Sequence, residues 1–145
     1  MHLIRYALLA AALMSLSGCK SDDGALSPAV RLAESDWRAE AINGVPVSSS
    51  TRVTLSFNEG NASGRGGCNQ YSGSVTMDDR RISFGPLIST KMACVDGNAM
   101  QTEATYFAAL QGAQSYAFAP ADKLTISGAA GNIVFAPQPR QIRPQ

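Results

Sequence analysis

Residues 65–73 read RGGCNQYSG, a short run in which two glycines precede a cysteine and a third glycine follows later. Such a run suits a phosphate-binding loop, a reactive thiol or a structural bend. A P-loop ends in Lys followed by Ser or Thr and then enters a helix. Here the chain continues into YSGSVTM (71–77), which alternates as a strand does. No helix N-terminus is therefore expected to follow the glycines and bind a phosphate or a dinucleotide.

The N-terminus, MHLIRYALLAAALMSLSGCK (1–20), has the features of a bacterial lipoprotein signal. Arg5 precedes an apolar stretch over residues 6–16 that is too short for a spanning helix. Leu16-Ser17-Gly18-Cys19 then resembles the lipobox, in which signal peptidase II cleaves before the cysteine and that cysteine is lipidated. We expect residues 1–18 to be the signal peptide. The alternative is an ordinary signal peptide in which Cys19 is incidental.

Lipidation of Cys19 predicts a membrane anchor without a spanning helix. Acyl chains such as palmitate hold a protein firmly when two or more are attached, and bacterial lipoproteins carry three. Lys20 and Ser21 follow the cysteine, where lipoproteins retained in the inner membrane usually have Asp. We therefore expect the protein at the cell outer membrane, anchored through its lipid, with its domain facing the periplasm.

The mature chain from Cys19 to Gln145 is 127 residues long, which suits one domain. Without Arg5 it has eleven basic and eleven acidic residues, so it offers no electrostatic footprint for nucleic acid. Cleavage also removes His2, the single histidine of the chain, which excludes Ser-His-Asp triads, Cys-His pairs and histidine-ligated zinc. We expect a monomer that is not an enzyme, with no catalytic residues, no metal and no cofactor.

Two further cysteines, Cys68 and Cys94, would lie in an oxidising compartment, where thiols tend to pair. A disulfide between them would stabilise the fold by about 3.5 kcal/mol on a chain-entropy estimate. A catalytic Cys68 would need a neighbouring cation such as Lys91 or Arg65, and Cys94 would consume the thiol. We therefore interpret the glycine run as a bulged strand beside a Cys68–Cys94 disulfide, where the Asn69 amide satisfies local backbone groups.

The dominant period in the rest of the domain is two, as in half-buried strands. Alternating apolar residues predict strands around residues 53–57, 71–77, 82–84, 116–118, 124–126 and 133–135. The stretches between them are typical turns, namely NEGN (58–61), DDR (78–80), PAD (120–122) and GAAGN (128–132). Short strands with such turns predict a strongly curved antiparallel meander.

One segment, NAMQTEATYFAALQG (98–112), has the helical period instead. Its apolar stripe consists of Met100, Ala104, Phe107 and Leu110. Asn98 is the expected N-cap and Gly112 the expected stop. We therefore expect an α+β, mostly β fold with one helix over about 98–111 packed by this stripe on a sheet of about seven or eight short strands.

The ends of the chain lack both periods. Residues 19–34 are polar and contain Pro28, so we expect a flexible tether between lipid and domain. Residues 137–145 read PQPRQIRPQ, and their three prolines predict a disordered tail. The folded domain should then occupy residues 35–136.

The glycine run and its surroundings resemble the META domain, also called the HslJ-like domain. The resemblance is carried by GRGGCNQYSGSV (64–75), FGPLISTKMAC (84–94) and the helix that follows. The residues that match, in the order of the family, are Trp37 with INGVPV (42–47), then Gly67, Cys68, Asn69, Tyr71 and Gly73, then Thr90, Met92, Ala93 and Cys94, and last Glu103. The resemblance covers about residues 37–136. It implies a cracked, partly open antiparallel β-barrel with one helix packed on it, and it brings no catalytic residues.

The resemblance implies a function outside catalysis. Such domains occur in heat-shock-inducible envelope proteins linked to novobiocin tolerance. In fold they resemble pilotin lipoproteins, which hold lipid or peptide in the barrel crack. We expect a non-enzymatic outer-membrane lipoprotein that acts in envelope stress tolerance or binds a hydrophobic ligand or peptide. The expected surface is the open seam, near Trp37, Tyr71 and Met92, although Trp37 as the single tryptophan is more often a core anchor.

Three other readings stay open. One is a pilotin-like or inhibitor-type interaction module that docks a peptide on an exposed strand edge. Another is a thiol redox protein that uses Cys68 and Cys94. The third is a carboxylate-based hydrolase, although the acidic residues are scattered. Glu103 is the one acid inside a matching motif, and we expect it to bond the backbone, Lys91 or Arg65.

Overall fold

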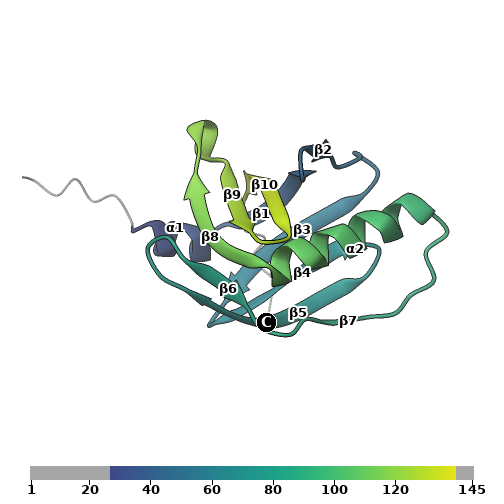
Figure 1. Ribbon diagram of the computed structural model, residues 1–145, viewed down its shortest axis with the longest axis horizontal. Coiled ribbons are helices and arrows are strands. Elements are labelled where there is room, and N and C mark those ends of the chain that lie inside the picture. The colour runs from purple at the N-terminus through teal and green to yellow at the C-terminus, as the bar shows by residue number, and fades with distance from the viewer. Residues whose placement is uncertain (1–26, 140–145) are drawn as a thin grey trace, which may run out of the picture.

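The computed structural model describes residues 27–139, which form one antiparallel sheet of ten strands with two α-helices and a short 3₁₀ helix (Figure 1). The strands are β1 (Asp36–Ile42), β2 (Val45–Pro46), β3 (Arg52–Asn58), β4 (Asn61–Gly67), β5 (Gln70–Met77), β6 (Ile82–Phe84), β7 (Ile88–Ser89), β8 (Ala113–Phe118), β9 (Leu124–Gly128) and β10 (Gly131–Gln138). The helices are α1 (Pro28–Glu34), α2 (Gly97–Gln111) and the 3₁₀ helix Pro120–Asp122.

The strand order β6-β5-β4-β3-β1-β10-β9-β8 curls until its two terminal strands meet. Arg81, next to β6, forms an isolated antiparallel bridge with Ser115 of β8. Beside it the Tyr116 N–H donates to the Arg80 carbonyl at 3.0 Å. This contact is short, so the sheet is a nearly closed barrel with one unsealed seam. The predicted mostly β, partly open barrel of about seven or eight short strands is confirmed: eight strands form the barrel, and the two-residue strands β2 and β7 pair with β1 and β5 outside that order.

The strands that were predicted from alternation are all present. In β3 the inward residues Val53, Leu55 and Phe57 are at most 3% exposed, while the end residues Arg52 and Asn58 face solvent. The hairpin to β4 turns at Glu59-Gly60, where both residues have positive φ (46° and 79°). Two successive positive φ angles are typical of the tight turns that match strand twist.

Strands β1 and β4 lack the regular alternation of apolar and polar residues that predicts a strand, each for a different physical reason. In β1 the pairing with β10 shifts register between Ala39 and Ala41, so a bulge breaks the alternation. In β4 the sequence NASGRGG has few side chains to alternate. A Cβ on Gly64 would overlap the Thr54 carbonyl oxygen of β3, so glycine allows the strands to approach closely there.

Helix α2 begins and turns slightly differently from the prediction. Its N-cap is Asp96, whose carboxylate accepts the Asn98 N–H at 2.9 Å, so Asn98 lies in the first turn and is not the cap. The buried residues are Ala99, Tyr106, Ala109 and Leu110. Met100 (54% exposed) and Ala104 face solvent, so the predicted stripe is wrong for these two. Polar anchors on α2, described below, fix the rotation of the helix instead.

Helix α1 lies in the segment that we expected to be tether. Ser27 caps it by accepting the Val30 N–H, and Pro28 suits its first turn. Leu32 is fully buried, and its carbonyl accepts the Trp37 Nε1–H at 3.1 Å. Residues 28–34 of the expected tether are therefore helical. The burial of Leu32 and its hydrogen bond with Trp37 hold this helix against the barrel. Residues 19–26 lie outside the described part.

Strand β10 also runs past the predicted boundary of the domain. Pro137 pairs with Trp37 and Gln138 with Asp36, so the first two residues of the expected tail belong to the sheet. Residues 140–145 lie outside the described part. Within residues 27–139, neither α-helix is long and apolar enough to cross a membrane.

Candidate functional site

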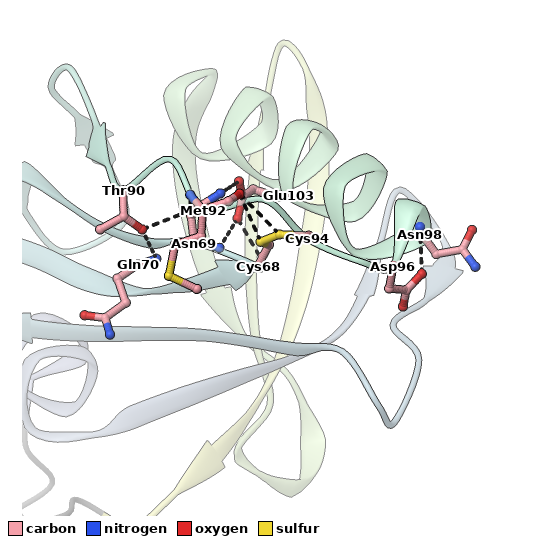
Figure 2. The surroundings of a disulfide bond; sticks show 9 residues. All are labelled: Cys68, Asn69, Gln70, Thr90, Met92, Cys94, Asp96, Asn98 and Glu103. Carbon is pink, nitrogen blue, oxygen red and sulfur yellow. Dashed lines mark hydrogen bonds between the residues drawn. A yellow bond between two sulfur atoms is a disulfide. The ribbon is translucent and has the colours of Figure 1, made fainter.

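Six residues of the matching motifs meet where the β4–β5 connection, the segment after β7 and helix α2 come together (Figure 2). Cys68 lies in the β4–β5 connection, and Cys94 lies in the segment that leads to α2. The structure joins them by a disulfide, with Cα atoms 6.1 Å apart. The covalent link closes a loop over 26 positions and fixes the approach of the chain to α2.

The carboxylate of Glu103 is the polar centre of this cluster. Its Oε2 accepts the backbone N–H groups of Cys68 (3.2 Å) and Asn69 (2.6 Å), and its Oε1 accepts the Asn69 side-chain amide (2.7 Å). Three donors on one carboxylate give strong charge-assisted hydrogen bonds. The expectation that Glu103 bonds the backbone is met, whereas no ion pair joins it to Lys91 or Arg65 within residues 27–139.

Asn69 carries the connection one step further. It is 7% exposed, so its polar atoms need partners. Its Oδ1 accepts the Met92 N–H at 2.7 Å and the Thr90 hydroxyl at 3.0 Å. The Thr90 Oγ1 in turn accepts the Gln70 N–H at 3.2 Å. Glu103, Asn69 and Thr90 therefore link α2, the β4–β5 connection and the segment after β7 in one network, visible in Figure 2.

The glycines before Cys68 make room for α2. Gly67 has φ +134°, a conformation that side chains rarely adopt, and a Cβ there would lie 2.9 Å from the Ala99 carbonyl. A Cβ on Gly66 would lie 2.7 Å from the ring of Phe107. The bend is therefore required for the helix to approach closely enough for Glu103 to reach the backbone N–H groups.

The carbonyl oxygen of Met92 lies 3.8 Å from Cys68 Sγ and 3.7 Å from Cys94 Sγ. Disulfide sulfurs carry no proton, so these are contacts and not hydrogen bonds. The side chain of Met92 is 57% exposed, and that of the next residue, Ala93, is also exposed. The two residues thus place backbone in the cluster and side chains in solvent.

Two tyrosine hydroxyls extend the contact between α2 and the sheet. Tyr71 of β5 and Tyr106 of α2 lie 2.7 Å apart, oxygen to oxygen, and both reach the Thr54 carbonyl of β3, at 2.9 and 3.2 Å. Their rings meet edge to face with centroids 5.6 Å apart. Each tyrosine hydroxyl has one proton to donate, whereas three pairs of oxygens lie within hydrogen-bond distance. At any moment the Thr54 carbonyl therefore accepts one hydrogen bond, and one tyrosine oxygen accepts the other. This contact fixes the rotation of α2 near its middle.

Burial governs the ionisation of this pair. Desolvation raises the pKa of Tyr71 above its ordinary value, and the hydrogen bond from Tyr106 opposes the rise only in part. Desolvation, followed by repulsion from Tyr71, raises the pKa of Tyr106 well above its ordinary value. Both phenols therefore stay protonated in the folded protein at pH values where exposed tyrosines ionise.

The remaining motif residues serve packing. Trp37 is 2% exposed and lies against Phe118, ring centroids 6.0 Å apart. A Cβ on Gly73 would lie 2.8 Å from the Leu87 side chain, so glycine lets the chain after β6 cross β5 closely. The reading of Trp37 as a core anchor agrees with its burial.

The seam itself has a shallow hollow with a volume of about 330 Å³. Its lining consists of Thr76, Met77, Asp78, Arg81, Ile82, Ser83, Ala113 and Gln114. Trp37, Tyr71 and Met92, which we expected near the seam, are not among them. Tyr71 is buried in the barrel core. Trp37 is also buried, but it lies at the floor of a different hollow of about 280 Å³, beside α1 and Phe118 and away from the seam.

Sequence reasoning missed Thr54, Tyr106 and the residues of the seam. Thr54 contributes a backbone carbonyl, which no side-chain pattern reveals, and Tyr106 was hidden inside an apolar helix. Within residues 27–139 no three His, Cys, Asp or Glu side chains are grouped to hold a metal ion. The arrangement as a whole is a polar clamp, which we define as Cys68, Asn69, Thr90, Met92, Cys94 and Glu103.

Comparison with known families identifies the fold. The model of the META domain matches residues 30–140. The chain belongs to the META domain family. The match begins inside α1, so this helix is part of the region that the family model covers.

Two solved structures are similar to this META domain. An NMR structure of a protein from Burkholderia xenovorans is 25% identical, with a TM-score of 0.63, and the match covers 83% of this chain and 97% of that one. A second NMR structure is 24% identical, with a TM-score of 0.61, and the match covers 74% of this chain and 92% of that one. The second likeness concerns the fold alone. No curated protein matches the chain.

Replacing Glu103 by Gln tests the polar clamp. An amide offers one acceptor oxygen, so at least one of the three donors would lose its partner or face another donor. We expect Glu103→Gln to lower the free energy of unfolding by about 2–3 kcal/mol, measured by urea denaturation of the oxidised protein. The exposed Glu59→Gln, in the β3–β4 turn, should change it by less than about 0.5 kcal/mol. Equal effects of the two substitutions would contradict a structural role for this carboxylate.

The tyrosine pair predicts a loss of stability in alkali. The unfolded tyrosines release protons above pH 10 while the folded ones keep them, so the unfolded state binds fewer protons and the free energy of unfolding falls with rising pH. The fall should reach about 1.4 kcal/mol per pH unit for each of the two tyrosines. In urea titrations between pH 9 and 11.5, Tyr106→Phe should show a shallower decline than the wild type. Parallel curves would refute the assignment.

Proposed function

We propose that this META domain protein is a non-enzymatic lipoprotein of the outer membrane, which acts in envelope stress tolerance by binding a hydrophobic ligand or peptide. The observation that carries the proposal is the Leu16-Ser17-Gly18-Cys19 sequence at the end of a short apolar stretch. Eight residues separate Cys19 from Pro28, the first residue of α1. A chain of that length keeps the domain within about 30 Å of its lipid anchor.

The seam supports binding as the mode of action. Apolar side chains of Met77, Ile82 and Ala113 contribute to its hollow, and polar side chains of the neighbouring strands surround them. Small concave sites with apolar walls and a few polar groups are typical of ligand binding. The polar clamp favours a structural and not a catalytic role for Glu103, since three donors already occupy its carboxylate.

For each of two alternative functions, one specific observation bears on the choice. A pilotin-like or inhibitor-type interaction module would use an open strand edge, and among the described strands β7 pairs on one side only, with β5. A thiol redox protein would use Cys68 and Cys94, but both are only partly exposed and the disulfide lies inside the polar clamp. Reduction would have to break a structural link, so this reading has less support.

Fractionation of the native host tests the anchor. The wild-type protein should sediment with outer membranes, and mass spectrometry of its N-terminal peptide should find acyl chains on Cys19. Cys19→Ser should release the protein to the soluble periplasmic fraction, whereas Ser21→Ala should leave it bound. A Cys19→Ser protein that still sediments with the membrane, or an unmodified cysteine in the wild type, would refute the anchor.

The same preparations test the ligand. Native mass spectrometry of wild-type protein extracted from outer membranes should show a bound hydrophobic ligand or peptide. Ser83→Trp, which places a ring over the hollow, should remove that mass, whereas Ala117→Trp, at an exposed position of β8 outside the hollow, should keep it. A wild-type protein without bound mass, or a ligand that both variants retain, would contradict binding at the seam.

A further inference from the structure

Strand β7 lies at a margin of the sheet, away from the seam. It pairs on one side with β5, through Tyr71 with Ser89 and Ser72 with Ile88. Among the described strands, none pairs with its other edge. Figure 1 shows β7 beyond β5, with α2 on the opposite side of β5 in that view.

The open edge continues past the two residues of β7. The Thr90 N–H donates to the Gln70 carbonyl at 3.0 Å, and the Met92 N–H donates to Asn69 Oδ1 at 2.7 Å. Residues 88–90 therefore lie alongside β5, and Met92 lies beside the β4–β5 connection that precedes it. The Cys68–Cys94 disulfide and the rest of the polar clamp hold this segment in place, so a partner would meet a preformed edge.

The hydrogen-bond pattern shows which peptide groups are available. In an antiparallel pair, successive residues direct their N–H and C=O groups alternately toward the partner strand and away from it. Thr90 directs its N–H toward β5. The peptide groups of Ser89 and Lys91 consequently point away from β5, toward the open edge.

Two large apolar side chains are exposed along the edge, and a third is exposed just beyond it. Ile88 is 75% exposed, Met92 is 57% exposed and Val95 is fully exposed. Between residues 86 and 95 the single charged residue is Lys91. The strand is short and carries Lys91 beside it, two features that keep an edge from pairing indiscriminately, so this edge suits a specific partner segment and not open-ended association.

We propose that the edge formed by residues 88–92 binds an extended peptide segment of a partner protein. The peptide pairs with the main-chain groups of Ser89 and Lys91, as in β-augmentation. Its alternate side chains are apolar and contact Ile88 and Met92. A carboxylate opposite Lys91 neutralises the one charge of the edge, so the preferred segment is acidic and rich in β-branched or aromatic residues.

A second copy of the chain fits the edge less well. If residues 88–92 paired antiparallel with themselves, the Lys91 side chains of the two copies would become diagonal neighbours on one face. Like charges in neighbouring cross-strand positions are destabilising. The charge on Lys91 therefore favours a foreign acidic segment over self-association.

This edge and the seam are separate surfaces. No residue of the segment 88–92 lines the hollow of the seam. An experiment can therefore refute peptide binding at this edge without refuting ligand binding at the seam, and the reverse also holds.

The test uses random decapeptides displayed on phage, selected against the full mature chain. Selected peptides should alternate β-branched or aromatic residues and carry Asp or Glu. Ser89→Pro removes one outward N–H, which an edge strand tolerates, and should weaken binding of the selected synthetic peptides at least tenfold. Ser89→Ala keeps that N–H and should leave the affinity unchanged, as should the seam variant Ser83→Trp. Lys91→Gln should weaken the binding of those selected peptides that carry Asp or Glu.

Hydrogen exchange supplies the second readout. Bound peptide should slow exchange of the Ser89 and Lys91 amides, which point to the open edge. Failure to select any peptide, equal affinity for Ser89→Pro, or protection confined to the seam would overturn the proposal. So would a dimer in sedimentation that Ser89→Pro abolishes, because the edge would then bind a second copy. The Ser89 amide could also be protected without peptide, and deletion of residues 20–26, which include Asp22 and Asp23, could remove that protection. The edge would then bind the chain's own N-terminal segment, and the proposal would be overturned.

Discussion

The fold depends on one carboxylate that reaches from a helix into a bend of the sheet. Glu103 accepts both backbone N–H groups at the end of the glycine run and the side-chain amide of Asn69. Those donors would otherwise be left without partners in a crowded region, which costs more than the bonds themselves contribute. Gly66 and Gly67 allow the close approach, and the disulfide at Cys68 holds the third segment against the same bend.

The residues of this small barrel that look functional in the sequence are mostly occupied with one another. Cys68 is bonded to Cys94, and the oxygens of Asn69 and Glu103 accept from neighbouring chain segments. The surfaces left for a partner lie elsewhere. One is the hollow where β6 and β8 fail to close, and the other is the free edge beside Ile88 and Met92. The clamp shapes the second surface, because Asn69 holds Thr90 and Met92 against the β4–β5 connection.

Much of the fold could be predicted from the sequence, because its strands are short, alternate cleanly and end in recognisable turns. Strand β4 could not, since it contributes glycines where other strands contribute apolar side chains, and the bulge in β1 hides its period. The rotation of α2 was also missed in part. Apolar spacing alone favours Met100, whereas Tyr106 and Glu103 set the rotation through polar bonds to the sheet. Helix α1 buries a single leucine, and its other contacts are a hydrogen bond with Trp37 and the contacts of Arg31 with Asp122 and Phe118, none of which a sequence pattern reveals.

The candidate site was predictable in membership but not in role. The motifs named Cys68, Asn69, Thr90 and Glu103, yet only geometry shows that Asn69 relays between the helix and the segment after β7. Backbone partners such as the Thr54 carbonyl leave no trace in a sequence pattern. Amide hydrogen exchange of Asn69 tests the role of the clamp most directly. If the clamp holds the fold together, this amide exchanges only through global unfolding, with the same opening free energy as the core of β3. An Asn69 amide that exchanges by local opening, several kcal/mol below that value while β3 stays protected, would contradict it.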